Sequence, residues 1–178
     1  MNRTWHSTSR RSLIRALAVL SLLLVGGACT IEERPDANRT FPTADLPPAQ
    51  APVVSHLTTP EMQALGFPFS EAVRVDHMLY LSGQVGNVPG ETTVVPGGIV
   101  AESRQVMENI KAIVERYGSS MEEIVKCTVM IDDIEEWGDF NVVYASYFPG
   151  PKPARSAFGA DGLALSAAVE VECWATVR

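Results

Sequence analysis

The apolar residues change their spacing midway between residues 100 and 131, and this change constrains the fold more than any other feature. Over residues 100–117 they recur three and four positions apart, as on one face of a helix, and Gly118 stands where such a helix would end. Residues 124–131 then form a β-branched, apolar run that is typical of a buried strand. A helix followed directly by a buried strand predicts a sheet with helices packed against it.

Other segments complete the predicted element order. Two short apolar runs on either side of Asp76 and His77 predict a hairpin within residues 72–85. A stripe of aromatic residues predicts a second helix, a loop rich in proline follows at residues 149–153, and residues 168–177 alternate as a final strand. The aromatic stripe consists of Trp137, Phe140, Tyr144 and Tyr147. With two strands counted after the second helix, the order β-β-α-β-α-β-β predicts an α+β fold, a mixed β-sheet with two helices on one face.

The N-terminal residues differ in composition from the rest of the chain. Residues 1–29 have a basic start, a run of ten apolar or small residues, and then Gly-Gly-Ala-Cys, which is the layout of a signal peptide. Ten residues make about 15 Å of helix, well short of the ~30 Å needed to span a bilayer. The small residues before Cys29 resemble the lipobox of bacterial lipoproteins and predict lipidation of Cys29. Residues 30–55 are then a proline-rich tether and residues 56–178 the folded domain.

The export route is left open by the sequence. Arg10 and Arg11 lie in a segment that resembles a twin-arginine signal, and they fit the basic start of an ordinary secretory signal equally well. Either route predicts a protein on the periplasmic side of a bacterial membrane, anchored there by a lipid on Cys29. Thr30 is not an aspartate-type signal for retention at the inner membrane, and this favours delivery to the outer membrane.

Charge and motif content exclude several classes of function. The chain carries a net charge of −7, and the part from Cys29 onward has ten basic against 21 acidic residues, a net of −11. This opposes binding to nucleic acid, which depends on basic residues that neutralise phosphates. The sequence holds no Gly-x-Gly-x-x-Gly, no Walker loop and no Cys-x-x-Cys, and its three histidines are scattered. We expect no metal and no cofactor, so that any catalysis uses ordinary side chains.

Cys127 and Cys173 both fall at predicted strand positions. An oxidising compartment would permit a disulfide between them if their Cα atoms lay within about 7 Å. Nothing in the sequence places the two strands side by side, so the sequence favours two separate buried thiols and leaves pairing open.

Arg155 and Glu170 are the candidate functional residues. Arg155 follows the proline-rich loop, and a rigidly held guanidinium is suited to gripping a carboxylate with two hydrogen bonds. In the final strand Val169, Val171 and Cys173 share one face, which leaves Glu170 with Glu172 and Trp174 on the other, where a carboxylate could handle protons. The alternative is an ion pair between Arg155 and a glutamate on the sheet surface.

Several separated segments together resemble the RidA (YjgF-like) family of enamine/imine deaminases. They are residues 66–73 (Gly-Phe-Pro-Phe-Ser-Glu-Ala-Val), 81–85 (Leu-Ser-Gly-Gln-Val), 109–114 (Asn-Ile-Lys-Ala-Ile-Val), 125–129 (Val-Lys-Cys-Thr-Val), 141–144 (Asn-Val-Val-Tyr), 153–156 (Pro-Ala-Arg-Ser) and 169–172 (Val-Glu-Val-Glu). The resemblance implies a chorismate-mutase-like fold assembled as a homotrimer, with three sites at the clefts between subunits.

The resemblance also implies a reaction, the hydrolysis of a short-lived enamine or imine of a 2-amino acid to a 2-keto acid and ammonia. In this reaction Arg155 would bind the substrate carboxylate, and Glu170 would position and activate the attacking water or shuttle its proton. Ser82, Gly83 and Asn141 occupy further pocket positions of the family, and Gly83 would allow a close approach of the backbone.

Two positions depart from the family pattern. Phe69 stands where deaminating members commonly carry tyrosine, and Ala157 stands where many carry cysteine. Phe69 keeps the aromatic surface, so we expect an altered or broader substrate choice. The alternative function is a noncatalytic trimer of the envelope that binds a small carboxylate in the same cleft. Ribonuclease activity, which has been attached to relatives, is opposed by the net charge of −11.

Overall fold

The computed structural model describes residues 50–178. The predicted signal peptide, the lipidation site at Cys29 and the tether up to residue 49 lie outside the described residues. Within residues 50–178 the strands are β1 (Val54–Leu57), β2 (Ala72–Val75), β3 (Met78–Leu81), β4 (Gln84–Val85), β5 (Ile124–Ile131), β6 (Ala154–Gly159) and β7 (Val169–Thr176). The helices are α1 (Pro60–Ala64), α2 (Gly98–Arg116) and α3 (Trp137–Ser146), and three short 3-10 turns cover Met121–Glu123, Ile134–Glu136 and Ala164–Ser166. None of the helices in this part of the chain has both the length and the apolar character needed to cross a membrane.

The strands form one mixed sheet in the order β1-β2-β3-β7-β5-β6, with β4 also paired to β7. β5 and β6 are parallel, because α3 carries the chain back between them, and all other pairs are antiparallel. In the hairpin of β2 and β3, Asp76 has a φ of 49° at the turn and its Oδ1 accepts a hydrogen bond from the backbone N–H of Val53. The predicted α+β fold with a mixed sheet is confirmed, whereas β1, α1 and β4 were not predicted.

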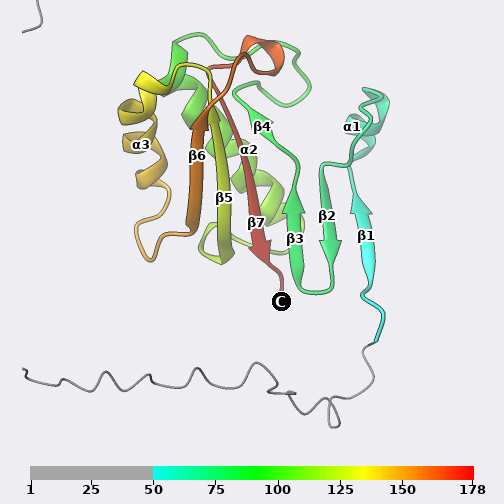
Figure 1. The fold of residues 1–178 in the computed structure, drawn as a ribbon. Helices are drawn as coiled ribbons and strands as arrows, with labels where there is room; N and C mark the ends of the chain where they lie inside the picture. The colour runs from blue at the N-terminus through cyan, green and yellow to red at the C-terminus, as the bar shows by residue number, and fades with distance from the viewer. Residues whose placement is uncertain (1–49) are drawn as a thin grey trace, which may run out of the picture. The chain divides into compact units, whose positions relative to one another are not determined.

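Both long helices cover the same face of the sheet. The apolar side chains of α2 pack in one buried cluster with Phe140 and Tyr144 of α3 and with the inward-facing residues of β5 and β7. Those inward-facing residues include Cys127, Val129 and Ile131 on β5 and Val169, Val171, Cys173 and Ala175 on β7. Figure 1 views the sheet from its other face, with α2 running behind the strands and α3 beside β6. The predicted alternation of the last strand is therefore confirmed, and Glu170, Glu172 and Trp174 lie on the uncovered face.

Cys127 and Cys173 form a disulfide, so the favoured prediction of two separate thiols is wrong. The two residues lie directly opposite each other on the antiparallel strands β5 and β7, with their Cα atoms 4.1 Å apart. Both are fully buried. The pairing depends on the position of β7 between β3 and β5. This strand order cannot be predicted from the local sequence of either strand.

The disulfide predicts a large contribution to stability. It joins residues 46 positions apart, and a bridge closing a loop of that length typically stabilises a protein by about 2–4 kcal/mol. The double variant Cys127→Ala/Cys173→Ala is expected to lose about that much free energy of unfolding in denaturant titrations. A reducing agent should lower the stability of the wild type and leave the double variant unaffected. Equal stability of the two proteins would contradict the prediction.

Candidate active site

A cavity of about 490 Å³ lies where β3 gives way to β4, and it brings together Phe69, Ser82, Gly83 and Glu170. β3 pairs with β7 as far as Tyr80 and Trp174, and pairing resumes through β4 at Gln84 and Val171. Three residues on one strand therefore face two on the other, as in a β-bulge, and the ladder is interrupted at Ser82 and Gly83. The interruption opens the sheet, so that the cavity is lined both by α2 and by Glu170 of β7.

Gly83 lies directly under the side chain of Glu170. A Cβ atom at position 83 would clash with Oε1 of Glu170 and would lie 2.8 Å from its Cδ. The close approach expected at Gly83 is thus an approach to this carboxyl group. Only a residue without a side chain leaves the carboxyl of Glu170 in its place at the cavity wall.

The environment of Glu170 favours its protonated form more than water does. Burial of the half-buried side chain raises the pKa of Glu170, and the negative charge of Glu172 on the same strand raises it further. No side-chain hydrogen bond to Glu170 is present within residues 50–178. A carboxyl group with a raised pKa, free to bond a ligand, suits a general base that accepts and returns a proton.

The polar groups of Ser82 bond to the backbone and help to hold the wall of the cavity in place. Its Oγ donates a hydrogen bond of 2.7 Å to the backbone carbonyl of Ser70, and its N–H donates to the carbonyl of Glu71. These bonds hold the segment that carries Phe69 against the bulge. The hydroxyl hydrogen of Ser82 is therefore engaged, and its oxygen has acceptor capacity left for a ligand.

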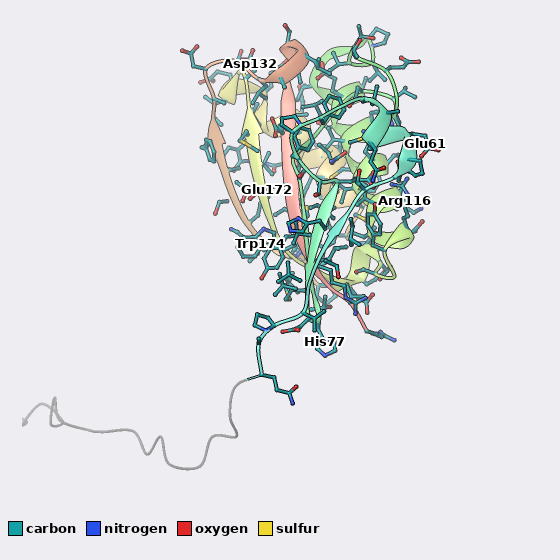
Figure 2. The ribbon with its side chains drawn as sticks, turned by 90° about the vertical axis from the view of Figure 1, so that its right-hand side faces the viewer. Glu61, His77, Arg116, Asp132, Glu172 and Trp174 are labelled. Carbon is teal, nitrogen blue, oxygen red and sulfur yellow. A yellow bond between two sulfur atoms is a disulfide. The ribbon has the colours of Figure 1, made fainter. Side chains whose placement is uncertain are left out.

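An ion pair between the buried Glu71 and the exposed Arg116 forms another part of the wall. Glu71 accepts hydrogen bonds of 2.6 and 2.7 Å from Nη1 of Arg116 and one of 2.6 Å from the hydroxyl of Tyr117. Burial and the bond to Glu71 raise the pKa of Tyr117 to about 12. Figure 2 shows Arg116 on the α2 side of the molecule, near Glu61 of α1. Sequence reasoning missed this pair, since nothing local to either residue shows that the end of α2 lies over the start of β2.

Arg155 is not part of this cavity. On β6 it is in register with Cys127, and its guanidinium carbon lies 4.7 Å from the ring centre of Tyr144, 5.6 Å from that of Trp137 and 5.7 Å from that of Phe140. These distances are those of cation–π contacts. Within residues 50–178 no carboxylate pairs with Arg155, so the alternative of an Arg155–glutamate ion pair on the sheet surface is wrong.

The predicted site residues thus fall into two groups. Phe69, Ser82, Gly83 and Glu170 line the cavity, whereas Arg155 and Ala157 lie on β6 and Asn141 on α3. Arg155 faces the helices because it is in register with the buried Cys127, and Glu170 faces the opposite side of the sheet. One copy of the chain therefore does not bring Arg155 to Glu170. Among the described residues no group of three or more His, Cys, Asp or Glu side chains could hold a metal ion.

Gly83→Ala is expected to lower activity strongly while leaving the fold intact. The new methyl group would displace the carboxyl of Glu170, because the clash is with the end of a side chain that can move aside. We expect a loss of kcat of about tenfold or more, since a catalytic group displaced by about 1 Å can cost up to a hundredfold in rate. Gly138→Ala is the matched control, because a Cβ at Gly138 on α3 would meet nothing within 4 Å. Equal rates for the Gly83→Ala variant and the wild type would show that this contact has no role.

Comparison with known proteins assigns the family. The family model described as Endoribonuclease L-PSP matches residues 59–177. The chain is 40% identical over 115 residues to the mouse protein named 2-iminobutanoate/2-iminopropanoate deaminase, covering 65% of this chain and 84% of that protein. It is 33% identical over 143 residues to Reactive Intermediate Deaminase A, chloroplastic, of Arabidopsis thaliana, covering 79% and 76%. The crystal structure of YyfA of the Rid family from Yersinia pestis superposes with a TM-score of 0.65 at 34% identity, covering 70% of this chain and all of that one.

The chain belongs to the RidA/YjgF/L-PSP family. The resemblance carried by the seven sequence segments is confirmed, and so is an α+β fold with a mixed sheet and two helices that matches solved structures of this family. The homotrimer stays a prediction.

Proposed function

We propose that the protein is a hydrolytic deaminase, a hydrolase acting on C–N bonds that converts 2-imino or 2-enamino acids to 2-keto acids and ammonia. Relatives at 33–40% identity carry the names of such deaminases. The observation that carries the proposal is Glu170, a half-buried carboxyl with a raised pKa that lies on Gly83 in the wall of a cavity large enough for a substrate.

We further propose that the complete site forms between two copies of the chain in a homotrimer. A substrate carboxylate needs a cation, and among the described residues lining the cavity the basic one is Arg116, which is already bound by Glu71. Arg155 carries a guanidinium without a carboxylate partner within residues 50–178, but on another side of the molecule. A site with both a free cation and the carboxyl of Glu170 forms if Arg155 of one copy reaches the cavity of the next copy.

The uncovered face of the sheet supports such an assembly. Trp174 and Phe158 are exposed there, Tyr80 packs edge-on against Trp174, and α2 and α3 lie on the opposite face. Exposed apolar side chains gathered on one face of a protein mark an association surface. Three copies related by a closed ring would bury this face and form three equivalent sites.

The proposed reaction needs one base and one anion-binding group. Arg155 holds the substrate carboxylate, and the carboxylate of Glu170 takes a proton from water while the water oxygen bonds to the imine carbon. The proton then passes from Glu170 to the imine nitrogen as the second bond of the C=N group breaks, which gives a tetrahedral intermediate with one hydroxyl and one amino group on the same carbon. Glu170 next moves the hydroxyl proton to that nitrogen, so that the C–N bond breaks and ammonia leaves as the C=O bond forms. Holding the imine and water together replaces a bimolecular encounter, which is the main help that a reactive imine requires.

The proposal is tested by generating imines in situ with an amino-acid oxidase and following their decay. The protein is expected to accelerate the release of ammonia above the spontaneous rate. Phe69 and Ala157 lack the hydroxyl and thiol commonly found at these positions, and this favours one alternative, a noncatalytic trimer that binds small carboxylates. Calorimetry that detects binding of a 2-keto acid without any acceleration of imine decay would support that alternative.

For the location, we propose export to the periplasmic side of a bacterial membrane with a lipid on Cys29. The signal-like residues 1–29 support this, and so does the Cys127–Cys173 disulfide, because such bonds persist in oxidising compartments. Incorporation of labelled fatty acid into the wild type and not into Cys29→Ala is the expected result. Nucleic acid is not proposed as a partner, because the net charge of −11 from Cys29 onward opposes it.

A further inference from the structure

We infer that the substrate is a 2-imino acid with a bulky, uncharged, apolar side chain, such as the imines formed from leucine or phenylalanine. This inference rests on the proposed deaminase function and adds the substrate class to it. It comes from the part of the cavity that extends away from Glu170 and Gly83.

That part of the cavity is lined by apolar side chains, most of which are exposed. They come from α1 and the segment after it, from α2 and from the turn before β7: Met62, Leu65, Phe67, Phe69, Ile113 and Leu165. Leu65, Phe67, Phe69 and Leu165 are between 43% and 51% exposed. Large apolar side chains that gather around a concavity and stay exposed are typical of a ligand site.

The two phenylalanines form one flat wall. The rings of Phe67 and Phe69 are stacked with their centres 5.2 Å apart and their planes 10° from parallel. A wall of this kind suits the flat or branched end of an apolar side chain. The aromatic ring at position 69, where the family commonly has tyrosine, thus belongs to an extended apolar surface.

The size of the cavity exceeds what a small imine fills. Its volume of about 490 Å³ lies in the range of sites that enclose drug-sized ligands. The methyl and ethyl side chains of 2-iminopropanoate and 2-iminobutanoate would leave the apolar wall in contact with water. A longer apolar side chain would cover it, and each buried methylene strengthens the interaction.

The charges in the cavity exclude an acidic side chain. Glu71, Glu91 and Glu170 line it together with Arg116, and the guanidinium of Arg116 is bound by both oxygens of Glu71. Among the described residues the cavity therefore has no free cation to receive a second carboxylate, and its excess of negative charge would repel one.

The test compares imines made in situ from alanine, leucine, phenylalanine and glutamate with the full-length protein. We expect kcat/KM for the leucine and phenylalanine imines to exceed that for the alanine imine by about tenfold or more, because a hydrophobic pocket discriminates by about that factor or more per methylene. Phe67→Ala and Leu65→Ala should each lower this ratio severalfold. Two variants are used because loss of Phe67 also removes the ring stacked on Phe69.

Val53→Ala is the control, since Val53 is 70% exposed and does not line this cavity. It should leave the ratio unchanged. Equal or higher kcat/KM for the alanine or glutamate imine, with turnover intact, would overturn this inference and leave the deaminase function standing. Absence of turnover for all four imines would overturn the deaminase function itself, and with it this inference.

Discussion

Replacing Arg155 by alanine is expected to lower kcat/KM for imine hydrolysis by about a hundredfold. The guanidinium can bind the substrate carboxylate through two parallel charge-assisted hydrogen bonds, and such bonds are worth up to about 3 kcal/mol, or about a hundredfold in rate. Arg155→Lys keeps the charge and loses the planar fork of donors, so it should recover part of the activity. The kcat/KM values of the wild type, Arg155→Ala and Arg155→Lys are compared by ammonia release in the oxidase-coupled assay.

The same variant should fold normally. Arg155 contacts the rings of Trp137, Phe140 and Tyr144 and makes no ion pair within residues 50–178. Its removal therefore leaves no buried carboxylate without a partner. Arg178→Ala is the control, because Arg178 pairs with Glu123 at the surface and its side chain is 92% exposed. It should leave the rate unchanged. An Arg155→Ala variant with kcat/KM within twofold of the wild type would contradict the role assigned to Arg155.

Replacing Glu170 by glutamine is expected to lower kcat by a factor of about 10²–10⁴, the usual contribution of a general base. Glutamine keeps the size of the side chain and cannot accept the proton from water. The wild type should also lose activity in acid, because the base works only when deprotonated. Since burial and Glu172 raise the pKa of Glu170, this loss should begin at a higher pH than for an ordinary glutamate, whose pKa is about 4.3.

Glu172→Gln is the matched control for this prediction. It removes the negative charge that helps to raise the pKa of Glu170, so the acid limb of the pH profile should shift to lower pH while activity at neutral pH persists. Rates measured from acid to neutral pH on the wild type and both variants supply the comparison. An acid limb that survives unchanged in Glu170→Gln would show that another group is the base.

The parts of the fold that could be predicted are those set by local periodicity. The spacing of Val106, Ile110 and Ile113 indicates a helix, and the alternation from Val169 to Cys173 indicates a strand with one buried face, whatever the rest of the chain does. β4 and α1 span two and five residues, too few for either period to show. The disulfide escaped prediction because it depends on which strands become neighbours.

The residues of the candidate site could be predicted from the sequence, but their positions relative to one another could not. Resemblance to the family indicated Arg155 and Glu170, but the two faces of the sheet on which they lie follow from the register of β6, β5 and β7. The aromatic stripe of α3 predicted a helix, and the contact of its rings with the guanidinium of Arg155 was not predicted. The ion pair of Glu71 and Arg116 joins residues 45 positions apart and depends on tertiary packing alone.

The central claim is that Arg155 of one copy completes the Glu170 cavity of another, and mixed assemblies of two inactive variants test it most directly. Arg155→Ala and Glu170→Gln are unfolded together in equal amounts, refolded, and assayed for imine hydrolysis. In a closed ring about one site in four receives both intact residues, so recovery of up to about a quarter of the wild-type activity is expected. A mixture as inactive as either variant alone, in assemblies shown to contain both chains, would contradict the claim.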